Sequence, residues 1–282
     1  MSSWTRSLHP AASGTKKRRY VLEFCGRPIK AVAIDIDGSY APGLDLSDFG
    51  YEVLRRVEEE GVSVVVVTGR CESAALTIAE RAGARGPAIS CTGAVITEPG
   101  TRERVALNPL PENDLEVALA LAEEMGLQPY VWDSAGIWTD REGPDTDYLG
   151  GCNFLTITPR PKPDRWDQPV KVMASASPEY LDAIAPEVVA RSTMERCLPG
   201  FFEACIPGCS KWDALKIVLE RIGVSPEETL GFGDSATDVE WLSQIGMPIA
   251  VENAAAPIQD LAVARIEHHE TDAAARFLAD LL

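Results

Sequence analysis

A short stretch near the amino end of the chain places two acidic side chains directly after an apolar run. Ala31–Ile34 contains four consecutive apolar residues, which is typical of a central strand of a parallel sheet, buried on both faces. Asp35 and Asp37 follow it two positions apart, so in an extended chain their side chains point to the same side. Because carboxylates at the end of a buried strand are costly to desolvate unless a cation meets them, this stretch predicts a charged site at a strand end.

Apolar strands followed by amphipathic helices recur in the first and last thirds of the chain. This alternation predicts a parallel, doubly wound α/β sheet, in which ligands bind at the carboxyl ends of the strands. Besides the strand before Asp35, strands are expected over residues 62–70, 88–91, 229–235 and 248–251. Helices are expected over residues 47–60, 72–82, 211–222 and 272–282.

The middle of the chain has a different pattern, in which short strands are mixed with two helices. Such a mixture indicates a separate α+β unit inserted into the α/β core. We therefore expect a discontinuous core over residues 20–96 and 205–282, an inserted domain over 97–204 and a disordered tail over 1–19. Within the inserted domain, helices are expected over residues 115–125 and 179–190, and strands over 130–132, 136–139, 153–157 and 170–175.

The composition argues against several classes of partner. The formal net charge of -17 disfavours nucleic acid and anionic membranes, because phosphate groups are held mainly by clustered Lys and Arg. No apolar run approaches the ~20 residues that a membrane span needs. The 7 cysteines form no Cys-x-x-Cys pair, which is typical of reduced thiols in a cytoplasmic protein. A cytoplasmic enzyme with a small-molecule substrate is expected, and nothing in the sequence predicts an oligomeric state.

Further polar residues fall at the expected strand ends and helix starts. Thr68 ends the second strand, Lys211 opens a helix, and Asp234 and Asp238 lie four positions apart across another helix start. At a shared edge of the sheet, the carboxylates would repel each other by up to ~4 kcal/mol per close pair at an effective dielectric of about 20. The site therefore needs a cation, and oxygen donors without a nearby histidine point to Mg²⁺ rather than zinc.

These residues make up four motifs in the order found in the haloacid dehalogenase (HAD) superfamily of phosphotransferases, which the chain resembles over its two core segments. The 143 positions between Thr68 and Lys211 exceed the ~30 residues of a strand-helix-strand unit, so a domain must be inserted there. The resemblance implies a Rossmann-like core with a large α+β cap, as in the Cof-type branch, which mostly hydrolyses phosphorylated sugars and related small metabolites. The motifs are Asp35-Ile-Asp37-Gly, Thr68-Gly69, Lys211 and Gly233-Asp234-Ser235-Ala-Thr-Asp238.

The resemblance also implies roles for the acidic residues. Asp35 would be the nucleophile that forms an aspartyl-phosphate, which divides one difficult displacement into two easier ones. Asp37 would protonate the leaving oxygen and later deprotonate the attacking water. Mg²⁺ would be held by the Asp35 carboxylate, the backbone carbonyl of Asp37 and Asp234, with Asp238 bound directly or through water.

Other residues would bind the substrate or support the site. Thr68 and Lys211 would bind the phosphoryl oxygens, and backbone amides around Gly69 would add donors. Arg70 is a candidate for holding the substrate, with a surface ion pair as the alternative, and Thr92 is a candidate substrate contact where the family often has Asn. Candidates for support of the metal site are Ser235 and Asn253.

Three other interpretations stay open. A phosphomutase or phosphotransferase would use the same core but move the phosphoryl group to a sugar. A signalling receiver module also uses an acidic pair, a phosphoacceptor Asp, Thr and Lys, but it has no Gly-Asp-x-x-x-Asp motif after its Lys and no insert of about a hundred residues. A catalytically idle binding protein is the third.

Overall fold

The computed structural model describes residues 22–133, 136–204, 206 and 208–282. The chain divides into two compact units. The first comprises the described part of Met1–Val65 together with Ala79–Gly86 and Val218–Leu282, and the second comprises the described part of Val66–Ile78 and Pro87–Ile217. The tail expected over residues 1–19 lies outside the described residues, and the expected boundaries of the inserted domain stay a prediction.

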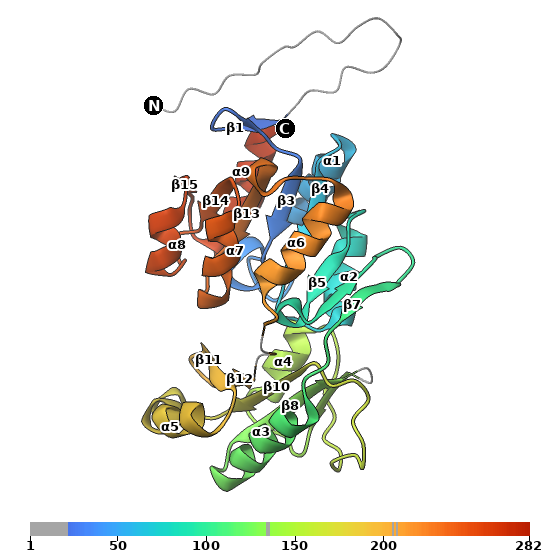
Figure 1. Ribbon diagram of the computed structural model, residues 1–282. Helices are drawn as coiled ribbons and strands as arrows, with labels where there is room; N and C mark the ends of the chain where they lie inside the picture. Colours follow the sequence, from blue (N-terminus) through green and yellow to red (C-terminus); the bar gives the residue numbers. More distant parts are fainter. Residues whose placement is uncertain (1–21, 134–135, 205, 207) are drawn as a thin grey trace, which may run out of the picture. The chain divides into compact units, whose positions relative to one another are not determined.

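The first unit is built on a parallel sheet with the strand order β15-β14-β13-β3-β4 (Figure 1). Parallel pairing joins β3 to β13, β13 to β14 and β14 to β15. Every residue of β3, β13 and β14 is buried, as is typical of strands covered on both faces. The strands are β3 (Ala31–Ile34), β4 (Ser63–Val66), β13 (Thr229–Gly233), β14 (Met247–Ala250) and β15 (Ala264–Arg265).

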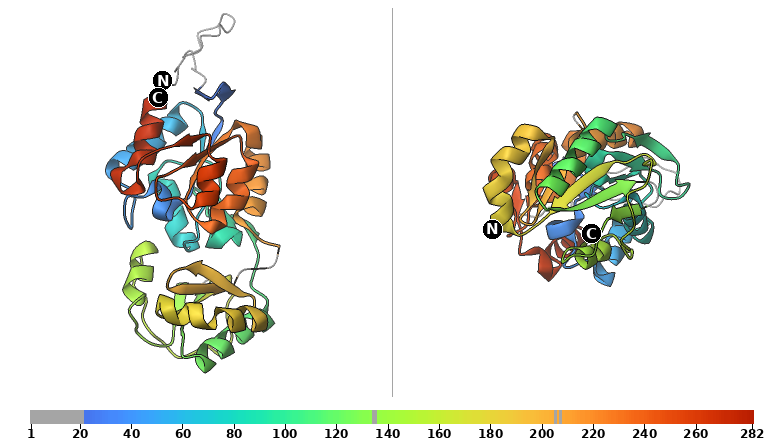
Figure 2. Two further views of the ribbon diagram at one scale, coloured as in Figure 1. Left: turned by 90° about the vertical axis from the view of Figure 1, so that its left-hand side faces the viewer. Right: turned by 90° about the horizontal axis from the view of Figure 1, so that it is seen from below.

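Helices cover the two faces of this sheet. Helices α1 (Asp48–Glu59) and α9 (Ala273–Leu281) pack against each other on one face, and α7 (Val239–Gln244) and α8 (Ala256–Leu261) pack together on the other (Figure 2). The expected core is confirmed as a parallel sheet between helix layers. Two further helices have residues in both units, α2 (Glu72–Arg81) and α6 (Lys211–Ile222).

The second unit contains a five-stranded antiparallel sheet with the order β11-β12-β10-β8-β9. Helices α3 (Glu112–Glu124) and α5 (Pro178–Arg191) pack on it, and a short helix α4 (Thr146–Cys152) follows β9. The expected α+β character is thereby confirmed. The strands are β8 (Gln128–Asp133, with Ser134 and Ala135 beyond it not described), β9 (Gly136–Thr139), β10 (Lys171–Ser175), β11 (Met194–Leu198) and β12 (Phe201–Ala204).

The two faces of this sheet bury different sets of side chains, because successive residues of a strand point to opposite faces. On one face, Val131, Val172 and Phe202 belong to the same apolar cluster as residues of α3 and α5. The other face has its own cluster, which includes Leu149 of α4. The residues that this sheet contributes to the second cluster are Tyr130, Trp132, Ile137, Met173 and Phe201.

A smaller antiparallel sheet in the second unit differs from the expected pattern. Strand β5 (Ala88–Ser90) pairs antiparallel with β6 (Val95–Thr97), which pairs with β7 (Arg104–Leu107). A single parallel bridge joins Ile89 to Val67, directly after β4. Strand β5 therefore keeps the expected parallel relation to the preceding strand at one position, while its other edge is antiparallel.

The strand expected over residues 153–157 is wrong, because the chain there folds back on the end of α4. The backbone amide of Asn153 donates to Leu149 O, and that of Leu155 donates to Gly150 O. Phe154 between them has a φ of 55°, in the left-handed region that ends many helices. These amides therefore close a helix end and are not available to a strand ladder.

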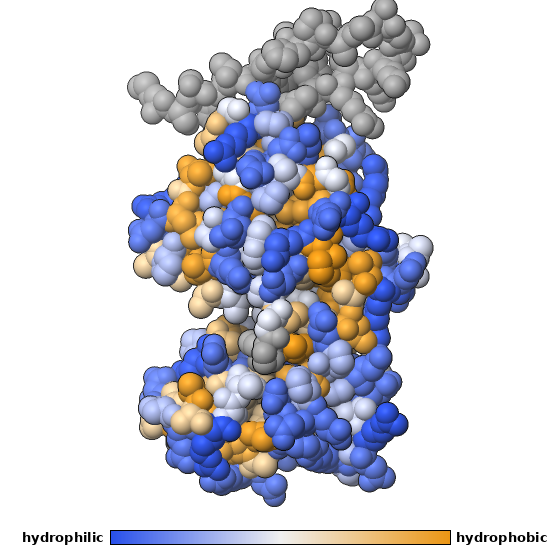
Figure 3. Space-filling model, viewed as in Figure 1, coloured by the Kyte–Doolittle hydropathy of each residue, from blue (hydrophilic) through white to orange (hydrophobic). Residues whose placement is uncertain are grey.

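Polar residues dominate the face of the molecule seen in Figure 3, where apolar residues gather in scattered patches. The large exposed apolar residues are distributed over both units and do not follow one element. Among the described residues, no helix combines the length and the apolar composition that crossing a membrane would require.

Candidate functional site

Three carboxylates converge in the first unit at the ends of neighbouring strands. Asp35 follows β3 and Asp234 follows β13, and the amide of Asp35 donates to the carbonyl of Phe232 in the adjacent strand. One carboxylate oxygen from each of Asp35, Asp234 and Asp238 lies within 4.8 Å of those of the other two. Asp35 is 4% exposed and Asp238 is fully buried. The parallel register of β3 and β13 thus brings together residues about two hundred positions apart.

The turn after β3 is shaped to fit against Asp234. Gly38 has a φ of 76°, and a Cβ atom at this position would lie 2.4 Å from Asp234 Oδ2. The Ser39 hydroxyl lies 3.2 Å from Asp35 Oδ2 and 2.8 Å from Asp234 Oδ1, within hydrogen-bond distance of both. Only a glycine at position 38 therefore allows this turn to approach the Asp234 carboxylate.

Asp238 holds the turn that presents Asp234. Its Oδ2 atom accepts hydrogen bonds from the backbone amide of Ser235 at 3.0 Å and from the Ser235 hydroxyl at 2.9 Å. Its Oδ1 atom accepts from Trp241 Nε1 at 2.8 Å. These contacts support Ser235 as a residue that stabilises the site. Whether Asp238 is also a metal ligand stays a prediction.

The donor set around Asp35 fits Mg²⁺. Mg²⁺ prefers hard oxygen ligands, commonly one or two carboxylates with carbonyl oxygens and water. Asp35 and Asp234 offer carboxylate oxygens, and Asp37, whose backbone carbonyl is the other expected ligand, lies in the turn Ile36–Tyr40 directly after Asp35. Neither His nor Cys belongs to this carboxylate group in the described part of the chain, which argues against a zinc site.

Asn253 connects the turn after β3 to a second loop. Its Nδ2 atom donates to Gly38 O at 2.7 Å, and its Oδ1 atom accepts from the backbone amide of His269 at 3.2 Å. His269 Nδ1 lies 3.0 Å from the same Oδ1 atom. Sequence patterns did not point to His269, which is hydrogen-bonded to Asn253.

We expect Asn253→Ala to lower the activity of the protein about tenfold and its stability by about 1–3 kcal/mol, because the Gly38 carbonyl loses its donor in a partly buried place. Hydrolysis of a phosphate monoester, the activity that the resemblance implies, and thermal melting measure the two effects. Gln244→Ala, on the exposed surface of α7, is the matched control and should leave both unchanged. Equal activity in the two variants would contradict a supporting role for Asn253.

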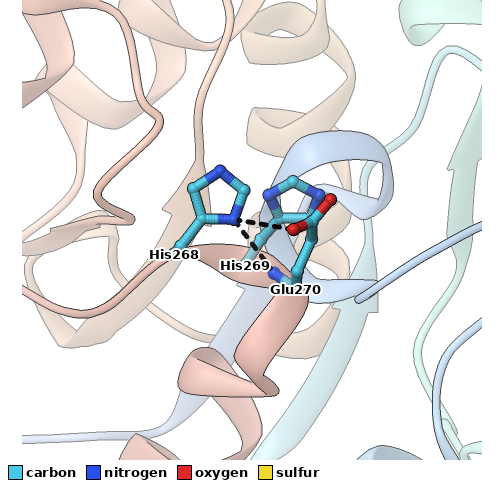
Figure 4. Close-up of side chains that lie close together, drawn as sticks. All are labelled: His268, His269 and Glu270. Atoms are coloured by element: carbon cyan, nitrogen blue, oxygen red, sulfur yellow. Dashed lines mark hydrogen bonds and ion pairs between the residues drawn. The ribbon is translucent and has the colours of Figure 1, made fainter.

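A second group that could hold a metal ion lies in the turn η5 (His269–Thr271) and the residue before it (Figure 4). His268, His269 and Glu270 offer ligand atoms within 4.8 Å of one another. Burial lowers the pKa of His269, and the neighbouring His268 lowers it further. Two imidazoles and one carboxylate form a different donor set from the carboxylates around Asp35, so the two groups suit different classes of ion.

In the second unit, the loops after β4 and β5 are joined by backbone hydrogen bonds. The amide of Thr92 donates to Thr68 O at 3.1 Å, and the amide of Cys91 donates to Arg70 O at 2.8 Å. Cys91 and Thr92 both have positive φ angles, of 49° and 59°, a strained conformation that is often found at functional sites. Arg70 is 3% exposed and its guanidinium carbon lies 5.3 Å from the ring centroid of Phe154, so Arg70 is a buried residue, and its role as a substrate contact stays a prediction.

The loop of Thr92 also lies against the start of α6. Gly93 has a φ of 103°, and a Cβ atom there would lie 2.3 Å from Ser210 O and 3.1 Å from the amide nitrogen of Lys211. Lys211 is 4% exposed. The second unit therefore gathers Thr68, Gly69, Arg70, Thr92 and Lys211 around two adjoining loops. That this group faces Asp35 and Asp234 stays a prediction.

Cys91 should be chemically inert although it lies in this loop. Burial raises the pKa of its thiol to about 12, so almost none of it is thiolate at neutral pH. At pH 8, iodoacetamide should modify the exposed Cys25 and leave Cys91 unmodified, as peptide mass spectrometry would measure. Equal labelling of the two would show that the loop opens readily.

Comparison with known proteins agrees with these motifs and this fold. A model of the haloacid dehalogenase-like hydrolases matches residues 32–278. The Bacillus subtilis protein named Phosphatase YwpJ is 24% identical over 288 residues, which cover 90% of this chain and 100% of the relative. A solved haloacid dehalogenase-like hydrolase from Bacteroides thetaiotaomicron has a TM-score of 0.81 at 23% identity and covers 90% of this chain and 100% of its own.

A further solved structure is that of BT4131, described as a sugar phosphatase of HAD subclass IIB. It has a TM-score of 0.72 at 16% identity, with 90% of this chain and 100% of that one covered. At these identities the solved structures establish the fold. The family model covers most of the chain, and it confirms the resemblance that the four motifs predict. The chain therefore belongs to the haloacid dehalogenase-like hydrolases.

Proposed function

We propose that the protein is a magnesium-dependent phosphomonoesterase that acts on a small phosphorylated metabolite, with sugar phosphates as the first class to test. The observation that carries this proposal is the convergence of Asp35, Asp234 and Asp238, with oxygens within 4.8 Å of one another at the ends of parallel strands. The names of the relatives, a phosphatase and a sugar phosphatase, support the same reaction class.

In this proposal the reaction passes through an aspartyl-phosphate on Asp35. The Ser39 hydroxyl, 3.2 Å from Asp35 Oδ2, restricts rotation of that carboxylate and so favours attack by one oxygen. Asp37, two positions further on and partly buried, protonates the leaving oxygen and then activates water. Asp35, Asp234 and the carbonyl of Asp37 would hold Mg²⁺, which when bound would neutralise the carboxylates and polarise the phosphoryl group.

The second unit would supply the phosphate and substrate contacts. Thr68, the amide of Gly69 and Lys211 would offset the charge of the phosphoryl oxygens in the transition state. Arg70 and Thr92 would contact the leaving group.

The test is release of inorganic phosphate from p-nitrophenyl phosphate and from a panel of phosphorylated metabolites. We expect hydrolysis that needs Mg²⁺, stops with EDTA and returns when Mg²⁺ is added in excess. A protein that binds Mg²⁺ but releases no phosphate from any member of the panel would contradict the proposal. Consumption of a bisphosphorylated sugar without phosphate release would favour the mutase alternative instead. The receiver-module alternative does not fit a family model that spans residues 32–278.

A further inference from the structure

A buried ion pair on the antiparallel sheet of the second unit has no place in the mechanism described so far. Lys171 on β10 and Glu203 on β12 approach to 2.7 Å between Nζ and Oε2, and their side chains are 6% and 8% exposed. Glu203 pairs in register with Met173, two residues beyond Lys171, so both side chains emerge on the same face of the sheet. That face also carries Tyr130 and Trp132.

Each member of the pair also contacts one of the two loops that are candidates for substrate binding. Lys171 Nζ donates to Gly69 O at 3.1 Å. The Thr92 hydroxyl donates to Glu203 Oε1 at 2.8 Å. Lys171 Nζ also lies 5.2 Å from the ring centroid of Trp132. A chain of polar contacts thus runs from Gly69 through Lys171 and Glu203 to Thr92.

The environment keeps Lys171 charged. Burial by itself would lower the pKa of Lys171, but Glu203, with smaller contributions from Cys197 and Cys91, opposes this effect and the pKa of Lys171 is raised. A buried ion pair is a poor source of stability, because desolvation of the charges offsets most of their attraction. The pair therefore calls for a role other than stability, and its contacts with Gly69 and Thr92 indicate one.

The direction of the hydrogen bond from Thr92 decides what this residue can offer a ligand. A threonine hydroxyl has one hydrogen to donate and two lone pairs to accept with. A charged carboxylate can only accept, so Glu203 takes the hydrogen of Thr92. Thr92 Oγ1 is then left as an acceptor, which suits a hydroxyl group on a ligand and repels a carboxylate.

We propose that Glu203, held by Lys171, fixes the Thr92 hydroxyl as a hydrogen-bond acceptor and so selects phosphate esters whose leaving group carries hydroxyl donors over those that carry a carboxylate. Lys171 and Glu203 act as positioning residues, and Thr92 is the residue that contacts the ligand. The inference rests on the proposed function in one respect, that Thr92 faces the substrate.

Glu203→Gln reverses the contact without changing its shape. The oxygen of the new amide would accept from Lys171, and its NH₂ group would donate to Thr92, which frees the Thr92 hydrogen for a ligand acceptor. We expect the ratio of kcat/KM for glucose 6-phosphate to that for 2-phosphoglycolate to fall about tenfold, while hydrolysis of p-nitrophenyl phosphate, which has neither group, changes less than about threefold. Glu116→Gln, on the exposed surface of α3, is the control and should leave the ratio unchanged.

Two further variants separate selection from general damage. Lys171→Met combined with Glu203→Leu removes both buried charges and leaves no acceptor for the Thr92 hydrogen, and we expect it to recover the melting temperature lost in Glu203→Gln but not the ligand ratio. Thr92→Val removes the hydroxyl, and in that background Glu203→Gln should have no further effect on the ratio. Equal losses on all three substrates, or a ratio that recovers together with the melting temperature, would overturn the proposal.

A binding measurement tests the ligand preference independently of whether the protein hydrolyses phosphate esters. Calorimetric titration of glucose 6-phosphate and 2-phosphoglycolate into the Asp37→Asn protein with Mg²⁺ reports the preference without turnover. If the native protein releases phosphate from no member of the panel but this preference is present and is lost in Glu203→Gln, the proposed function fails and the inference stands. If both esters bind equally well with and without Glu203, or neither binds, the inference fails.

Discussion

Asp35→Asn is expected to abolish phosphate release, with a loss of at least about 10³-fold in kcat, because an amide oxygen is a very weak nucleophile compared with a carboxylate. The release of p-nitrophenol in the presence of Mg²⁺ measures the loss. Asp48→Asn, at the exposed start of α1, removes the same charge elsewhere in the first unit and should keep full activity.

Asp35→Asn should also raise the melting temperature of the protein when EDTA is present. Asp35 lies in a group of three carboxylates with oxygens within 4.8 Å of one another, and each close pair repels by about 3 kcal/mol at an effective dielectric of about 20. Mg²⁺ should then stabilise the native protein more than the variant, since a ligand that binds only the folded state stabilises it by RT ln(1 + [L]/Kd), which increases as the affinity increases. If addition of Mg²⁺ leaves the melting temperature of both proteins unchanged, this result would argue against a metal site at Asp35.

Gly38→Ala is expected to have the second-largest effect. The new Cβ would lie 2.4 Å from Asp234 Oδ2, so either the turn after β3 or the Asp234 carboxylate must move. The positive φ of 76° adds about 1 kcal/mol of backbone strain for a residue with a side chain. We expect a total loss of about 2–4 kcal/mol in the free energy of unfolding and a loss of about 10²-fold in activity, since small displacements at a reacting centre are costly.

Two other glycines separate the strain from the clash. Gly26 also has a positive φ, of 72°, but a Cβ there would meet nothing within 4 Å. A Cβ atom at Gly43 would also meet nothing within 4 Å, and the φ angle of Gly43 lies outside the left-handed region. Chemical denaturation should therefore show Gly43→Ala as stable as the native protein, Gly26→Ala as slightly less stable and Gly38→Ala as clearly less stable. Mg²⁺-dependent activity should be lost only in Gly38→Ala. Full activity of Gly38→Ala would mean that Asp234 need not stay where the structure has it.

Most elements of the core could be predicted because local patterns determine them. The helix expected over residues 211–222 is confirmed as α6, and the strand before Asp35 is confirmed as β3, fully buried. The short strands were harder to predict from the sequence. Strands β11 and β12 carry no clear alternation, and the segment over 153–157 is apolar enough for a strand but instead closes the end of α4.

Part of the candidate site could likewise be predicted from the sequence and part could not. The motifs indicated Asp35, Asp234 and Asp238, because each follows a strand or opens a helix, and the structure brings these three together. They did not indicate that Trp241 would donate to Asp238 or that His269 would contact Asn253, since neither contact leaves a pattern in the sequence.

By itself, the sequence determined the alternation of strands and helices, the acidic residues at strand ends and the family, because periodicity and motif spacing are local properties of the chain. Only the tertiary structure decided which distant side chains meet. Lys171 lies 102 positions from Gly69, and Thr92 lies 111 positions from Glu203, yet each pair shares a hydrogen bond. Such contacts follow from strand register and from the packing of loops on a sheet. A slip of one residue in the register of β10 or β12 would turn Lys171 or Glu203 to the opposite face of the sheet.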